Sequence, residues 1–219
     1  DGSHERYIFY SKKETDSITI VYNFNSICMI NKKHLQTLRK GLHDYALVRR
    51  DVIKYAGDAL HHSKRAVFDM QKGDVKEAKK KLAEAEDLFK KLHKTHKKDT
   101  QILQEGSYKA AVEEYVEANL MYQFVTKGEL GDIKTFPIEA EVFLAGLCDV
   151  PGELYRYAIR AATNSDSKTV YACQSMANEI IGELIEFHLT SYLRTKFDQA
   201  KQSTQKLEIV VYEMSLRGK

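Results

Sequence analysis

Residues 75–92 read VKEAKKKLAEAEDLFKKL, and this stretch decides the fold class. Its apolar residues recur in alternating steps of three and four, the spacing that places side chains on one face of an α-helix. Charged residues of both signs fill the positions between them. We therefore expect a helix that buries one face, formed by Val75, Ala78, Leu82, Ala85, Phe89 and Leu92.

Similar apolar stripes continue on both sides of this stretch. The 219 residues include only two prolines and 11 glycines, so long helices with short connections are favoured. We predict one all-α domain over residues 31–219, a bundle of six or seven helices. The expected helices cover about 31–64, 75–97, 101–126, 137–163, 167 to 197 or 200, and 207–216, with a kink between Cys148 and Glu153 in the fourth.

The first 30 residues differ from the rest of the chain. Ile, Val, Thr, Tyr and Phe are common from Tyr7 onward, which favours a short extended N-terminal arm over residues 1–30. Residues 1–4 (DGSH) resemble a cloning remnant and carry no functional argument.

Charge, cysteine content and hydropathy limit the classes of protein. The net charge of +3, from 34 basic and 31 acidic residues, does not by itself indicate nucleic-acid binding. Three widely spaced cysteines and the lack of a run of 18 apolar residues favour a soluble protein of the reducing cytoplasm with no membrane segment.

Two glutamates are the only charges on one face of the third expected helix. At 100° per residue, Glu114 and Glu117 share a stripe with apolar and small side chains. Buried carboxylates are costly unless they are paired or hold a metal. This stripe comprises Leu103, Ser107, Ala110, Glu114, Glu117, Met121 and Val125.

The fourth expected helix carries a second acidic pair. Asp149 and Glu153 are one turn apart, so packing the two faces together would gather four carboxylates. Oxygen ligands of this kind suit Mg²⁺ or Mn²⁺, which can activate water and stabilise charge on a phosphodiester. Acidic pairs also occur on many solvated helices. Arg156 and Arg160 could pair with these acids or hold substrate phosphate.

Three segments carry a resemblance to a known family. Residues 114–118 (EYVEA) and 146–154 (GLCDVPGEL) resemble the catalytic branch of the translin family, that of translin-associated factor X. Residues 210–218 (VVYEMSLRG) resemble the end of translin. Within a helical pattern from about residue 34 to the end, this combination resembles a single-gene relative of the archaeal type.

The resemblance implies a fold, an activity and a site. It implies a translin-like bundle that acts as a Mg²⁺- or Mn²⁺-dependent endoribonuclease on short or single-stranded RNA, with single-stranded DNA as a further substrate, inside a homo-octameric shell. The catalytic acids would be Glu114, Glu117, Asp149 and Glu153, with Glu117 and Glu153 as metal ligands. Some relatives carry a further acid at the position of Ala111, and Pro151 replaces a non-proline residue. The alternative is a non-catalytic scaffold that binds RNA or DNA.

Other candidate sites have simpler explanations. His61 and His62, or His93 and His96, could bind a metal, but half-buried helix positions commonly hold histidine. Cys148 lacks the partners of a catalytic thiol, and a buried structural role is favoured. The lysine runs of the second helix alternate with acids, which is typical of a solvated face. Lys109, Arg156 and Arg160 are the basic residues that we expect to contact nucleic acid.

Overall fold

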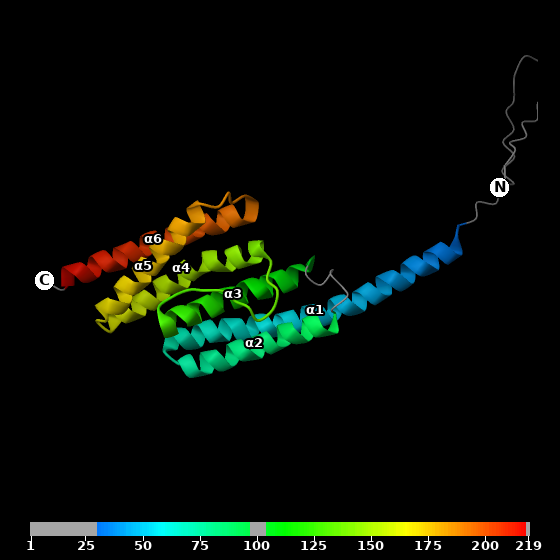
Figure 1. Cartoon of the computed structure of the whole chain (residues 1–219), viewed down its shortest axis with the longest axis horizontal. Helices are drawn as coiled ribbons and strands as arrows, with labels where there is room; N and C mark the ends of the chain where they lie inside the picture. Colours follow the sequence, from blue (N-terminus) through cyan, green and yellow to red (C-terminus); the bar gives the residue numbers. More distant parts are fainter. Residues whose placement is uncertain (1–29, 97–103, 218–219) are drawn as a thin grey trace, which may run out of the picture. The chain divides into compact units, whose positions relative to one another are not determined.

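The computed structural model describes residues 30–96 and 104–217, and in these residues it has six helices and no strand (Figure 1). The prediction of an all-α fold with six or seven helices is confirmed. The predicted arm lies outside the described residues, apart from Ile30. The helices are α1 (Lys32–Lys72), α2 (Val75–Thr95), α3 (Gly106–Lys127), α4 (Ala140–Thr163), α5 (Ser167–Ile185) and α6 (Ser191–Arg217).

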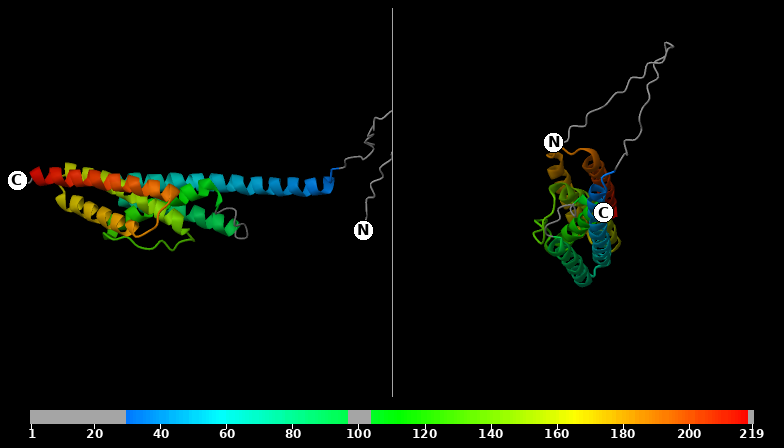
Figure 2. Two further views of the ribbon diagram at one scale, coloured as in Figure 1. Left: turned by 90° about the horizontal axis from the view of Figure 1, so that it is seen from above. Right: turned by 90° about the vertical axis from the view of Figure 1, so that its right-hand side faces the viewer.

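The chain divides into two units, Asp1–Leu42 and His43–Lys219. The described part of the first unit is Ile30 and the opening turns of α1, where the His34 amide donates to the Asn31 side chain at 3.0 Å, as an N-cap does. The second unit holds the packed helices. Within it α4 is central, because α3, α5 and α6 all pack against it (Figures 1 and 2).

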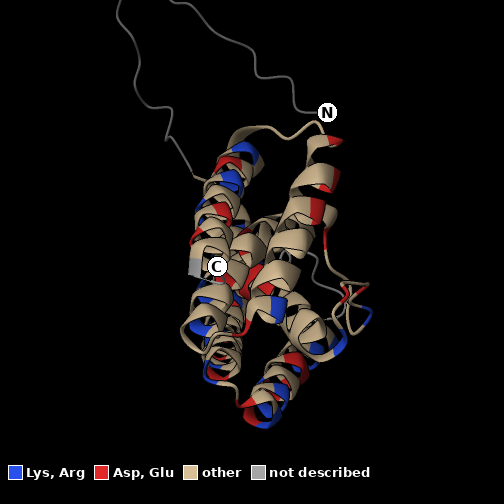
Figure 3. Ribbon diagram, turned by 90° about the vertical axis from the view of Figure 1, so that its left-hand side faces the viewer, with Lys and Arg blue, Asp and Glu red and all other residues tan. Residues whose placement is uncertain are grey.

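The spacing of residues 75–92 predicted the buried face of α2 correctly. Ala78, Leu82, Ala85, Phe89 and Leu92 are buried, and Val75 at the start of the face is half-buried. The Phe89 ring lies 5.5 Å from that of Tyr115 and 4.7 Å from that of Phe136, which joins α2 to α3 and the loop after it. Lys, Arg, Asp and Glu alternate along the outer helices (Figure 3). Among the described residues, no helix combines the length and apolar character needed to cross a membrane.

A glycine sets the separation of α3 and α4. A Cβ atom on Gly146 would lie 2.6 Å from the carbonyl oxygen of Glu113 and 2.7 Å from Cβ of Val116. Any larger residue would therefore push the two helices apart. The close approach brings the acidic faces of α3 and α4 together.

Several predicted helix boundaries were wrong. α1 continues past Lys64 to Lys72, because Val67 and Met70 extend its buried face. It stops where Gly73 adopts a φ of +86°. α4 begins at Ala140 rather than Pro137, and it remains helical through Pro151.

The helix predicted to run to about residue 197 or 200 ends at Ile185. The chain then turns without glycine or proline, and Ser191 has a φ of +48°. This turn was missed because it lacks the residues that usually mark a break. Residues 191–217 form one helix, α6, that packs on α4 and α5.

Candidate active site

Three of the four predicted acids line one pocket of about 330 Å³. Glu114 and Glu117 come from α3 and Glu153 comes from α4, as the helical spacing predicted. α1 supplies the rest of the wall except for one arginine of α4. These other lining residues are Lys64, Val67, Phe68 and Arg156.

Glu117 is the most unusual residue of the pocket. It is 9% exposed, and no hydrogen bond or ion pair to a described residue satisfies its carboxylate. Burial raises its pKa well above the usual value, and repulsion from Glu114, Asp149 and Glu153 raises it further. A buried carboxylate in this environment requires a proton or a cation.

The other two acids of the pocket have polar partners. Lys64 Nζ lies 3.1 Å from Glu114, whose pKa is nevertheless raised because burial is the larger effect. Glu153 accepts from Arg156 Nη1 at 2.8 Å and from Gln71 Nε2 at 2.9 Å. These contacts hold two basic groups at the pocket wall, where they could instead contact phosphate.

Asp149 is the fourth predicted acid, and it lies beside the pocket in a separate network. Lys196 Nζ of α6 lies 2.5 Å from Asp149 Oδ2 and 2.6 Å from Glu113 Oε1. Tyr192 also donates to Glu113, at 2.8 Å. Burial lowers the pKa of Lys196, but its hydrogen bonds to both acids outweigh this effect and raise that pKa above the ordinary value. Lys196 therefore stays charged and neutralises Asp149.

The donor set fits a hard divalent cation in chemical type, although the carboxylates lie apart from one another. In the described part of the chain, no three His, Cys, Asp or Glu side chains are grouped closely enough to hold a metal ion. Lys64, Arg156 and Lys196 each form an ion pair with one of the acids, Glu114, Glu153 and Asp149 respectively. Glu117 alone has no such partner, so a cation entering the pocket would meet an uncompensated carboxylate and could then recruit Glu153 or Glu114.

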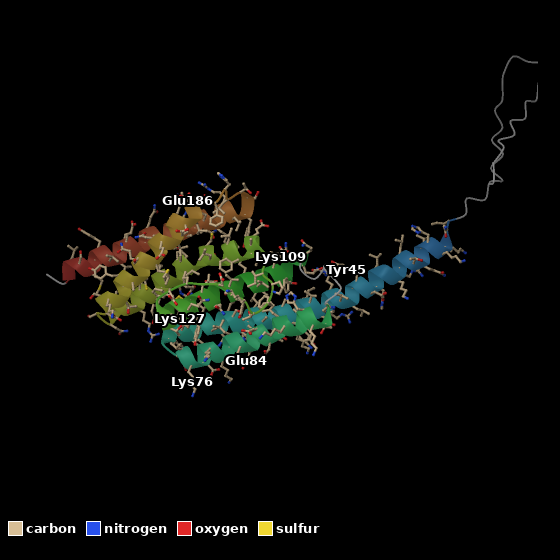
Figure 4. All side chains as sticks on the ribbon, viewed as in Figure 1. Tyr45, Lys76, Glu84, Lys109, Lys127 and Glu186 are labelled. Atoms are coloured by element: carbon tan, nitrogen blue, oxygen red, sulfur yellow. The ribbon has the colours of Figure 1, made fainter. Side chains whose placement is uncertain are left out.

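Two of the three predicted nucleic-acid contacts lie outside this pocket. Lys109 is near the start of α3 (Figure 4) and lies 3.1 Å from Glu139. Arg160 Nη2 donates to the Lys72 carbonyl at 2.5 Å and so satisfies the end of α1. Arg156 is the one that borders the acids.

Two of the candidate histidines, His93 and His62, pair with neighbouring side chains, and Cys148 is a buried thiol. His93 Nε2 lies 2.7 Å from the Tyr108 hydroxyl, within the aromatic core, and His62 lies 3.0 Å from Glu84. Burial raises the pKa of the Cys148 thiol to about 12, so its nucleophilic thiolate form is scarce.

Sequence reasoning missed Lys196 and its partner Glu113. A signal was present, since Lys196 shares a helical face with Leu193, Phe197 and Ala200, and these three are buried. A lysine on an apolar stripe indicates a buried ion pair. Its partners could not be identified, because the turn before α6 was not predicted.

Comparison with known proteins decides the family. The translin family profile matches residues 47–218. The chain belongs to the translin family. Chicken (Gallus gallus) translin is 30% identical over 84 residues, a match that covers 38% of this chain and 37% of translin.

Solved structures of C3PO proteins share the fold of this translin-family chain. Apo-NeC3PO gives a TM-score of 0.75 at 19% identity, covering 85% of this chain and 98% of that one. The protein chain of the AfC3PO–duplex RNA complex gives a TM-score of 0.73 at 24% identity. The match covers 84% of this chain and 97% of that one. At these identities the likeness establishes the fold alone.

Proposed function

We propose that this chain is a Mg²⁺- or Mn²⁺-dependent endoribonuclease that cuts short or single-stranded RNA, with single-stranded DNA as a second substrate. One observation carries the proposal: Glu117 is buried and unpartnered in a pocket that also holds Glu114 and Glu153. A stable scaffold gains nothing from such a carboxylate, whereas a metal site requires one. Membership of the translin family, and the structure of AfC3PO in complex with duplex RNA, support nucleic acid as the ligand.

Each charged residue of the pocket has a role in this proposal. Glu117 and Glu153 would hold the cation, which when bound would supply a Lewis acid for the phosphodiester and lower the pKa of water. Glu114 accepts a hydrogen bond from the attacking water and takes up its proton, while the P–O bond to the leaving ribose oxygen breaks and that oxygen is protonated from solvent. Arg156 and Lys64 leave their carboxylate partners to bind phosphate oxygens. Lys196 pairs with Asp149 and fixes it beside the pocket.

A second candidate function is a nucleic-acid-binding scaffold without turnover. It is favoured by the ion pairs that already occupy Glu114, Glu153 and Asp149. In a scaffold these pairs would persist when a divalent cation is added, and Glu117 would remain protonated.

We also propose that the chain assembles into a homo-oligomer, octameric by its family resemblance. Ile209, Tyr212 and Leu216 form an apolar stripe on α6 and are all more than half exposed. Closed symmetry would cover such stripes without open-ended association. Light scattering should give one large species, which Tyr212→Asp should disrupt; a monomer at micromolar concentration would contradict the assembly.

Incubation with end-labelled single-stranded RNA separates the enzyme from the scaffold. The enzyme should produce internal cuts with Mn²⁺ or Mg²⁺ and none with excess chelator, which controls for metal-independent ribonuclease. Tight binding with no metal-dependent product would favour the scaffold.

A further inference from the structure

Phe68 of α1 is exposed within the carboxylate pocket. Its side chain is 40% exposed, whereas Val67 before it and Met70 two residues after it are buried. It borders the same pocket as Glu114, Glu117 and Glu153. Single exposed apolar residues are common on protein surfaces. Exposure alone therefore does not indicate that Phe68 binds a ligand, and the residues around it have to be considered.

Basic side chains surround this ring. Lys72 Nζ lies over the ring, 4.3 Å from its centroid, and the Arg65 guanidinium carbon lies over it at 5.2 Å, so a base that stacks on the ring takes the place of one of these cations. Lys64 and Arg156 line the pocket together with the acids. An aromatic ring with several cations nearby is the arrangement by which proteins bind single strands, because bases stack on the ring and phosphates contact the cations.

We propose that Phe68 stacks against an unpaired nucleobase of the strand whose phosphate enters the pocket. This inference rests on the proposed function, since it assigns a substrate contact to the same site. A base within a duplex has both faces covered by neighbouring bases, so it cannot stack on Phe68 without being pulled out. Phe68 would therefore make the pocket selective for single-stranded segments and fix the position of the phosphate next to the stacked base.

The chain offers an unusually direct probe. It has 13 tyrosines but no tryptophan, so Phe68→Trp places a single tryptophan, which can be excited selectively, at the proposed contact. Phe187→Trp is the matched control, because Phe187 is 49% exposed and does not line the pocket. Both variants are titrated, in excess chelator to prevent metal-dependent cleavage, with a short oligouridylate and with an abasic sugar–phosphate strand of equal length.

Stacking predicts that the oligouridylate quenches the fluorescence of the Phe68→Trp protein and that the abasic strand does not. The Phe187→Trp protein should respond to neither strand. In the otherwise unchanged protein, Phe68→Ala should weaken oligouridylate binding by about fivefold to a hundredfold and leave binding of the abasic strand unchanged. The single-strand preference over duplex should fall by the same factor.

Two results would overturn the stacking proposal. One is fluorescence of the Phe68→Trp protein that does not change with oligouridylate, or that changes equally with the abasic strand. The other is fluorescence that depends on protein concentration alone, which would place the ring between copies of this chain. Because these titrations need no turnover, a positive result would stand even if cleavage proved absent.

Discussion

Lys196 Nζ lies 2.5 Å from Asp149 Oδ2, and this contact links α6 to the acidic face of α4. The same ammonium lies 2.6 Å from Glu113 of α3. One lysine, with a side chain that is 16% exposed, thus neutralises two acids beside the pocket. Lys196 stabilises the site without lining it.

Removing this charge should destabilise the protein. Lys196→Met leaves Asp149 and Glu113 without their cation, and we expect a loss of roughly 3 kcal/mol in the free energy of unfolding by urea. Adding Asp149→Asn and Glu113→Gln to this variant should recover most of the loss. An unchanged unfolding midpoint in the single variant would show that the ion pairs contribute little.

The spacing of α3 and α4 should be equally sensitive. Gly146→Ala forces a methyl group against the Glu113 carbonyl, so we expect a loss of about 1–3 kcal/mol in stability and weaker metal binding. Gly182→Ala in α5 is the control, because nothing lies within 4 Å of its Cβ, and it should stabilise by up to about 1 kcal/mol. Equal effects of the two substitutions on stability would show that the close packing of α3 and α4 at Gly146 does not determine it.

Glu117 should make the metal-free protein less stable as the pH rises. Its pKa in the folded state is raised well above 4.5, so between that value and the folded pKa the unfolded chain ionises first and stability falls. The Glu117→Gln protein should not lose stability in this way, because glutamine does not ionise. At neutral pH without metal, we expect its Tm to exceed that of the unmodified protein by at least about 2 °C, which corresponds to about 1 kcal/mol. A lower Tm at every pH would contradict this.

Substitutions of the two arginines of α4, Arg156 and Arg160, should have different effects, one on RNA binding and the other on stability. Arg156 borders the acids, so Arg156→Gln should weaken RNA binding and reduce its salt slope by about one. Arg160→Gln should instead cost about 1 kcal/mol of stability, because it removes the hydrogen bond to the Lys72 carbonyl. If both substitutions changed the salt dependence of RNA affinity equally, both arginines would contact the RNA.

Helical periodicity predicted the parts of the site that depend on one helix at a time. It placed Glu114 with Glu117, and Asp149 with Glu153, and the close packing at Gly146 brings the two faces together. It could not predict contacts from helices whose position depends on turns. Lys196 reaches Asp149 only because the chain reverses after Ile185 without glycine or proline.

The hydrogen bond of Arg160 could not be predicted from the sequence for a related reason. Its acceptor is a main-chain carbonyl at the end of α1, a helix that was expected to stop near Lys64. A basic residue two turns after Glu153 has the same spacing whether it binds phosphate or another helix. Only the tertiary arrangement separates the two roles.

The central claim is that Glu117 holds a catalytic cation, and metal-dependent cleavage by Glu117→Gln tests it most directly. Glu141→Gln is the matched control, since Glu141 is an exposed glutamate on α4 that does not line the pocket. We expect internal cutting of end-labelled RNA in Mn²⁺ to fall at least about a hundredfold in Glu117→Gln and to be unchanged in Glu141→Gln, with both variants folded. Full metal-dependent cleavage by a folded Glu117→Gln protein would contradict the account.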